Sequence, residues 1–170
     1  LKKRIKWLIE HKESGRLANH EALICLVLSI AANYFQDDYF QNSSIQRIQS
    51  LLKWKNDEGW FEEYAGFDVG YETLTFSCLL RLIEILPESY NLLADVIHQQ
   101  AQIIIDSIEP DGCLGGELYS RGTWNCFTHG LVKYALIKQK EYIPKVLELL
   151  ETKYIKYPYE IKDDYIIQHH

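Results

Sequence analysis

The stretch "EALICLVLSIAANYF", residues 21–35, is apolar at nearly every position. A helix of this composition has no polar side to turn to water, so we expect it to be buried on all sides. The stretch "LTFSCLLRLIEIL", residues 74–86, predicts a second helix of the same kind. Residues 42–54 lie between the two and carry a single apolar stripe among Gln, Arg, Ser and Lys, which is typical of an amphipathic helix.

Buried and amphipathic helices therefore alternate along the chain. This alternation is typical of stacked helical hairpins, in which an outer layer of helices covers an inner layer and exposes its own far face to solvent. Strand signals are scarce. Seven helices are expected, at residues 2–12, 19–35, 42–54, 71–86, 89–108, 125–138 and 141–155.

The inner helices are expected to begin near residues 19, 71 and 124, and this regular spacing indicates a repeat. A polar, glycine-bearing loop precedes each of them: "ESGRLAN", "DEGWFEEYAGFDVG" and "PDGCLGGELYSRG". Because all three loops enter the N-termini of inner helices, we expect them to meet on one face. The predicted fold is all-α, an incomplete α/α toroid, with residues 1–170 forming a single domain or a fragment of one.

Composition narrows the class of protein. A chain of 170 residues that is 47% hydrophobic can bury one core, and its net charge of −6 argues against non-specific nucleic-acid binding. The longest apolar run, residues 22–32, is too short to span a membrane. The chain contains no methionine, which indicates a trimmed or partial product whose full-length chain carries further domains.

The four cysteines show no CxxC spacing and predict no disulfide framework. Cysteines without a disulfide framework favour a reducing compartment such as the cytoplasm. Chemistry on polysaccharides would instead fit a periplasmic or secreted protein. The sequence leaves the compartment open.

The second loop concentrates aromatic and acidic side chains. Trp60, Tyr64 and Tyr71 offer flat faces on which a sugar ring can stack, or they cover the ends of the helices. Glu63 and Asp68 are candidate substrate contacts. Asp68 immediately precedes a helix, where a carboxylate also caps free backbone N–H groups. A glycosidase would require two such carboxyls facing one cavity.

The third loop contains Arg121, whose planar guanidinium can grip a substrate carboxylate or tie this loop to the acids of the second one. Tyr119 and Trp124 flank it and are expected to contact substrate.

Two histidines lie on inner helices. His129 and His20 are each a candidate general base or a polar group satisfied in the core, and Asn19 beside His20 is a plausible N-cap. Cys126 and His129 are three residues apart, but two ligands without a second pair predict no zinc site. We expect neither a metal nor a cofactor.

Three blocks carry a family resemblance: "NHEALICLVLSIAANYF", "DEGWFEEYAGFDVGYETLTFSCLLRL" and "PDGCLGGELYSRGTW". Over roughly residues 17–135 they resemble the helical toroid of heparinase II/III-like proteins, the polysaccharide lyase type. The third block departs from the family pattern by the inserted Leu118 and by Gly122, where an asparagine is expected.

The resemblance implies β-elimination on a uronate-containing polysaccharide or oligosaccharide. Asn19 and Arg121 would neutralise the uronate carboxylate, and Tyr64, Tyr71 and His129 would be the candidates for proton transfer. Because Gly122 stands where the family pattern has an asparagine, the site lacks an amide that the resemblance would otherwise predict. This difference affects the expected activity but not the expected fold. Two alternatives stay open: a non-catalytic glycan-binding or interaction module, and a glycoside hydrolase of the same helical architecture.

Overall fold

The computed structural model describes residues 1–12, 14–63, 66–114, 126–152, 159–162 and 165–168. These residues form a mainly helical chain, which confirms the predicted all-α class. The helices are α1 (Lys2–Glu10), α2 (Ala18–Phe35), α3 (Asp38–Leu52), α4 (Val69–Ile85), α5 (Tyr90–Asp106), α6 (Thr128–Ile137) and α7 (Ile143–Glu151). Short 3₁₀ turns, Pro87–Ser89 and Lys140–Tyr142, precede α5 and α7.

A small β-hairpin follows the helices and was not expected from the sequence. Strand β1 (Tyr159–Lys162) pairs antiparallel with β2 (Tyr165–Gln168), in a register that places Tyr159 opposite Gln168.

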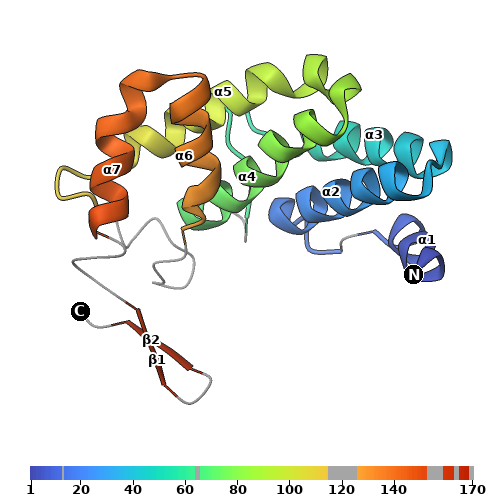
Figure 1. Cartoon of the computed structure of the whole chain (residues 1–170), viewed down its shortest axis with the longest axis horizontal. Coiled ribbons are helices and arrows are strands. Elements are labelled where there is room, and N and C mark those ends of the chain that lie inside the picture. Colours follow the sequence, from blue (N-terminus) through green and yellow to red (C-terminus); the bar gives the residue numbers. More distant parts are fainter. Residues whose placement is uncertain (13, 64–65, 115–125, 153–158, 163–164, 169–170) are drawn as a thin grey trace.

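The helices form two layers arranged as an arc (Figure 1). Helix α4 contacts α2 on one side and α6 on the other, and these three helices form the inner row. Helices α3, α5 and α7 each pack against the inner helix that precedes them. The predicted alternation of inner and outer helices is therefore confirmed, while closure of the arc into a toroid stays a prediction.

The inner helices begin at Ala18, Val69 and Thr128. The first two starts agree with the sequence to within two residues. The third lies later than the predicted position near residue 124, and its approach falls outside the described residues. Asn19 does not cap α2, as the sequence suggested, because Leu17 occupies the N-cap position and Asn19 lies within the first turn.

The hydrophobic core runs along the arc between the two layers. Its largest fully buried members include Phe61, Phe76, Leu79, Leu93 and Ile104. A smaller cluster joins α1 to the middle of α2 and the start of α3 through Ile5, Leu28 and Phe40. The array thus has a continuous main core and a separate contact at its N-terminal end.

Helix α2 is less buried than its composition predicts. Leu23, Val27 and Ile30 follow one another at helical spacing and are 39%, 39% and 43% exposed. The prediction that this helix is buried on all sides is wrong, because α1, α3 and α4 cover parts of it while the face that carries these three residues stays exposed. In α4, which has an inner neighbour on each side, most of the first three turns are buried.

Candidate functional site

Hydrogen bonds between loops and helix starts bring the N-termini of the inner helices together. The backbone N–H of Asn19 in α2 donates to Glu63 Oε1, at 2.7 Å, in the loop before α4. The backbone N–H of Phe127, just before α6, donates to Thr73 Oγ1 in the second turn of α4, at 2.8 Å. The three inner helices therefore start side by side, as the common direction of their entry loops predicted.

Glu63 is buried at this junction, although the sequence suggested a contact with substrate. It is 2% exposed, and its Oε2 has no hydrogen-bond partner among the described residues. Burial raises the pKa of Glu63 to about 7, and the nearby charge of Asp68 adds to this, while the N–H of Asn19 and the charge of His20 act in the opposite direction. The carboxyl thus exchanges its proton near neutral pH.

Glu72, in the first turn of α4, is fully buried and joins three parts of the chain. Its two oxygens accept hydrogen bonds from the backbone N–H of Phe61, at 3.2 Å, and from Nε2 of Gln100 in α5, at 2.7 Å. Burial raises the pKa of Glu72 to about 8. This carboxyl fixes the second loop and α5 to α4, which is a structural role.

Asp68 caps α4, as the sequence predicted. Its Oδ1 accepts the backbone N–H of Tyr71 at 3.0 Å, and the side chain is 3% exposed. Asp68, Glu63 and Glu72 are therefore all enclosed by protein, and they present no pair of carboxyls to an open cavity.

His20 and Tyr71 occupy the same position in successive repeats, because each is the third residue of its inner helix. His20 is exposed and Tyr71 is half-buried. Trp60 is also half-buried, with its indole N–H donating to Glu58 Oε2 at 2.7 Å and its ring packed edge-on against Phe67. The ring of Trp60 thus covers the second loop while keeping an accessible edge.

Asn19, by contrast, is 2% exposed, so it is placed to position Glu63 through its backbone rather than to meet a substrate. Four other predicted site residues lie outside the described residues: Tyr64, Tyr119, Arg121 and Trp124.

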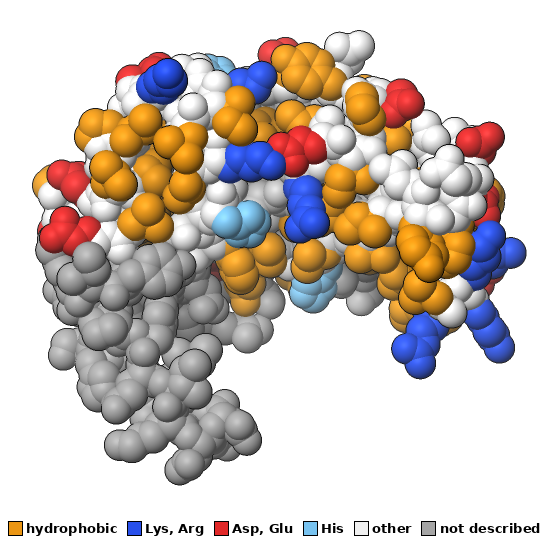
Figure 2. Space-filling view, viewed as in Figure 1, with side chains coloured by type: hydrophobic (Ala, Val, Ile, Leu, Met, Phe, Trp, Pro, Cys, Tyr) orange, Lys and Arg blue, Asp and Glu red, His pale blue; other side chains and the backbone are white. Residues whose placement is uncertain are grey.

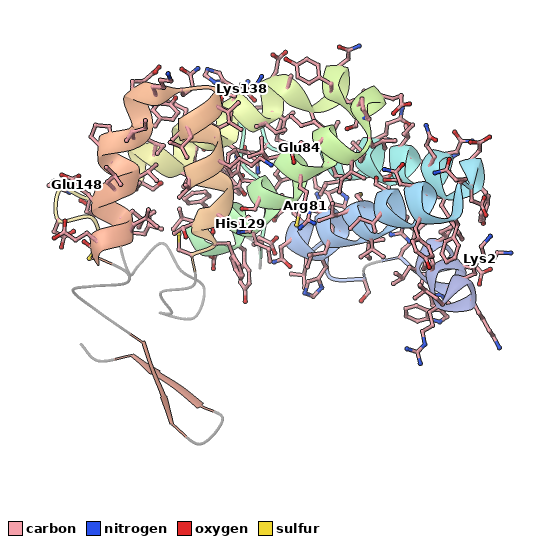
Figure 3. All side chains as sticks on the ribbon, viewed as in Figure 1. Lys2, Arg81, Glu84, His129, Lys138 and Glu148 are labelled. Carbon is pink, nitrogen blue, oxygen red and sulfur yellow. The ribbon has the colours of Figure 1, made fainter. Side chains whose placement is uncertain are left out.

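A groove of about 280 Å³ opens between α4 and α6. It is lined by Ser77, Leu80, Arg81, Glu84, His129, Gly130 and Lys133. Figure 3 shows Arg81 and His129 on these neighbouring helices, projecting on the same side of the array. Both side chains are exposed, and neither has a hydrogen bond or ion pair with the described residues. An ion pair between Lys133 and Glu84 lies farther along the groove.

The groove depends on close contact between the two helices. A Cβ atom at Gly130 would lie 2.9 Å from the Cα of Ser77, so only glycine fits this approach. Ser77 Oγ also donates to the backbone carbonyl of Phe127 at 3.3 Å. This contact brings the first turn of α6, which carries His129, beside the turn of α4 that carries Arg81.

Arg81 was not predicted as a site residue. The sequence contained one indication of it, a single arginine inside the mostly apolar run 74–86. A guanidinium stays protonated at physiological pH and can grip a carboxylate or sulfate with two parallel hydrogen bonds. Histidine is the side chain best suited to exchange a proton near neutral pH. The groove therefore combines an anion-binding group with a proton acceptor.

A second recess, of about 460 Å³, opens over Glu21 and Arg47, between α2, α3 and the end of α1. Glu21 and Arg47 are already paired with each other, because Arg47 Nη1 donates to both carboxylate oxygens of Glu21 at 2.8 Å. Arg47 Nη2 also donates to the carbonyl oxygen of Leu8 at 2.5 Å. The buried charges of this recess are therefore neutralised within the fold, and Lys12 is the other charged side chain that lines it.

Within the part of the chain that the structure describes, no three His, Cys, Asp or Glu side chains are grouped so that they could hold a metal ion. None of the helices in that part has the length and apolar character needed to cross a membrane. When compared with models of protein families, with curated proteins and with solved structures, the chain matches none of them.

Proposed function

We propose that this chain is a carbohydrate-active domain that binds a uronate-containing polysaccharide along its inner helices and cleaves it by β-elimination. The observation that carries the proposal is that Arg81 and His129 line one groove, and neither has a hydrogen bond or ion pair with a described residue. The repeated helical hairpins and the sequence blocks that resemble polysaccharide lyases support the same class of activity.

The chemistry requires two kinds of group. Arg81 would bind the uronate carboxylate and reduce its negative charge, which makes the adjacent C5 proton more acidic. His129 would accept that proton as the electron pair of the C–H bond forms a C4=C5 double bond and the C4–O bond breaks. The departing oxygen then takes up a proton from a second acid or from water. The product carries an unsaturated uronate with strong ultraviolet absorbance.

The inner row offers further groups near the N-termini of its helices. His20 and Tyr71 occupy equivalent places on α2 and α4, at least partly accessible, and Tyr71 carries a hydroxyl of the kind that protonates a leaving oxygen. In the proposal, the glycan extends from the groove towards this end of the inner row.

A non-catalytic glycan-binding module is the second candidate. It is favoured by His129, which lacks a carboxylate or carbonyl among the described residues to orient its ring for proton transfer. The glycoside hydrolase alternative draws less support, because Glu63, Asp68 and Glu72 are all buried and serve as caps or links.

The test measures binding and cleavage separately on the 170-residue chain. A panel of polygalacturonate, alginate, hyaluronan and heparan sulfate is screened by calorimetry and by the ultraviolet absorbance of an unsaturated product. Arg81→Ala is expected to weaken binding of the responsive polysaccharide about tenfold or more, because a charge-assisted pair is lost. His129→Gln is expected to abolish product while binding changes by less than threefold.

The matched control is Lys138→Ala, which removes an exposed cation at the C-terminal end of α6. It should leave both measurements unchanged. Binding without product in the wild-type chain selects the non-catalytic module. Equal binding by the wild-type chain and Arg81→Ala would rule out the groove as the site.

A further inference from the structure

The two ends of the helical arc carry opposite charge. At one end, α1 presents Lys3, Arg4 and Lys6, which are exposed and have no partner among the described residues. Together with Leu8, Glu10 and Trp7, which is 55% exposed and stacks one ring face on His11, they line a recess of about 650 Å³. Figure 2 shows basic side chains gathered at this end of the molecule. The N-terminal end is therefore a basic surface with an aromatic centre.

At the other end, the last turns of α7 present Leu147, Glu148 and Glu151. Leu147 is 58% exposed, and both glutamates are exposed without a partner among the described residues. The nearby Lys145 is already engaged, because its Nζ donates to the carbonyl oxygen of Ile105 at 3.2 Å. Figure 3 places Lys2 of α1 and Glu148 of α7 at opposite ends of the array.

Each of these helices carries charge that opposes its own dipole. The N-terminus of a helix is partly positive, yet the first turns of α1 hold cations and no acid. The C-terminus is partly negative, yet the last turn of α7 holds carboxylates and no basic residue. The positive potential of α1 and the negative potential of α7 are therefore each reinforced by charged side chains of the same helix, and no described residue pairs with Lys3, Arg4 and Lys6 of α1 or with Glu148 and Glu151 of α7.

From these observations we infer that the chain associates head to tail with a second copy of itself, the α1 surface of one copy docking on the last turns of α7 of the next. Lys3 and Lys6 pair with Glu148 and Glu151, and the indole of Trp7 covers Leu147. Such a contact joins two different surfaces, so it extends into a ring or an open chain of copies rather than closing as a symmetric dimer.

The contact involves essentially one helix from each copy and is smaller than a standard protein interface. Association is therefore expected to be weak, to increase with protein concentration, and to fall as salt screens the charges. It is independent of the groove at Arg81, so it can be tested without a glycan.

Sedimentation velocity over a range of concentrations, at low and high salt, measures this association. The basic-end variant, Lys3→Glu with Lys6→Glu, and the acidic-end variant, Glu148→Lys with Glu151→Lys, should each stay monomeric at concentrations where the wild-type chain associates. An equimolar mixture of the two variants should associate again, because each reversed end then meets a complementary one. A chain with all four changes should recover self-association.

The control is Lys53→Glu with Glu88→Lys, two exposed positions away from both ends. It should associate as the wild-type chain does, and circular dichroism confirms that every variant is folded. A wild-type chain that stays monomeric at millimolar concentration and low salt overturns the inference. Failure of the mixture to associate overturns the pairing of these two ends.

Discussion

Glu72 links the pH of the solution to the stability of the fold. The pKa of its carboxyl rises from an ordinary value of 4.5 to about 8 in the folded chain, since burial disfavours the charged form. Between these values the folded chain holds a proton that the unfolded chain releases. The free energy of unfolding should therefore be highest below about pH 4.5, as far as this group is concerned, and fall as the pH rises towards 8.

Glu72→Gln is expected to remove much of this decline, because an amide stays neutral at every pH. Gln100 can turn its side-chain amide to pair with the new group, since its Oε1 has no partner among the described residues. Urea unfolding at pH 5 and pH 8 should show a difference that is smaller in the variant by on the order of 2 kcal/mol. The exposed control Glu88→Gln should keep the wild-type difference, and an unchanged pH dependence in Glu72→Gln would contradict the prediction.

Arg47 is the second residue on which the fold depends. Its guanidinium pairs with the buried carboxylate of Glu21 and donates to the carbonyl oxygens of Leu8, Ile9 and His11 at the C-terminal end of α1. Those carbonyls lack partners inside the helix, so a cation at this point satisfies them.

Arg47→Met should reduce the free energy of unfolding by about 3–5 kcal/mol, because it leaves a buried carboxylate without a counter-charge. Adding Glu21→Gln should recover part of this loss, as measured by urea unfolding of both single variants and the double variant. If the two losses simply add, the ion pair is not the source of the effect.

The packing of α4 against α6 is set by one glycine. Gly130→Ala would place a methyl group 2.9 Å from the Cα of Ser77, and a backbone atom cannot move aside as a flexible side chain can. We expect a loss of about 1–3 kcal/mol in the free energy of unfolding from this overpacking. The clash outweighs the gain of about 1 kcal/mol that alanine brings as a better helix former.

Gly66→Ala is the matched control, because a Cβ at Gly66 meets no atom of the described residues within 4 Å. Thermal unfolding should show little change for it and a clearly lower midpoint for Gly130→Ala. Equal midpoints for the two variants would show that α4 and α6 can shift apart enough to accommodate the methyl group at little cost.

The sequence predicted the helices well because their signals are local. Apolar periodicity placed α2, α4 and α5 within two residues of their observed ends, and Asp68 before an apolar run correctly predicted a cap. The candidate groove was not predicted, because it arises where a turn of α4 meets a turn of α6. Arg81 and His129 are 48 positions apart in the sequence, and only the close approach at Gly130 brings their helices together.

The sequence also could not predict which carboxyl groups are buried. Six acids lie between Asp57 and Glu72, and nothing in their spacing separates Glu72, which is fully enclosed, from Glu58, which is exposed. Their environments depend on α5 and α2, since Gln100 and the N–H of Asn19 supply the bonds that hold Glu72 and Glu63 inside. Long-range packing therefore decides which carboxyls are structural.

At the scale of the whole molecule, the arc is a row of hairpins in which each inner helix of the described chain packs mainly against its neighbours. Stability in such arrays is approximately the sum of each hairpin and its contacts, so the central and terminal parts should unfold differently. Helix α4 has an inner neighbour on both sides, whereas α1 is held through the small cluster around Ile5 and through Arg47.

Leu79→Ala and Ile5→Ala test this organisation, because both side chains are nearly or fully buried but lie in different clusters. Leu79→Ala, in α4, should cost about 2–5 kcal/mol and accelerate hydrogen exchange from α2 to α6 together. Ile5→Ala should accelerate exchange mainly in α1, because opening this helix leaves the main core intact. Hydrogen exchange followed by mass spectrometry of peptides from each helix separates these outcomes. Uniform acceleration along the chain in Ile5→Ala would instead show that the arc unfolds as one cooperative unit.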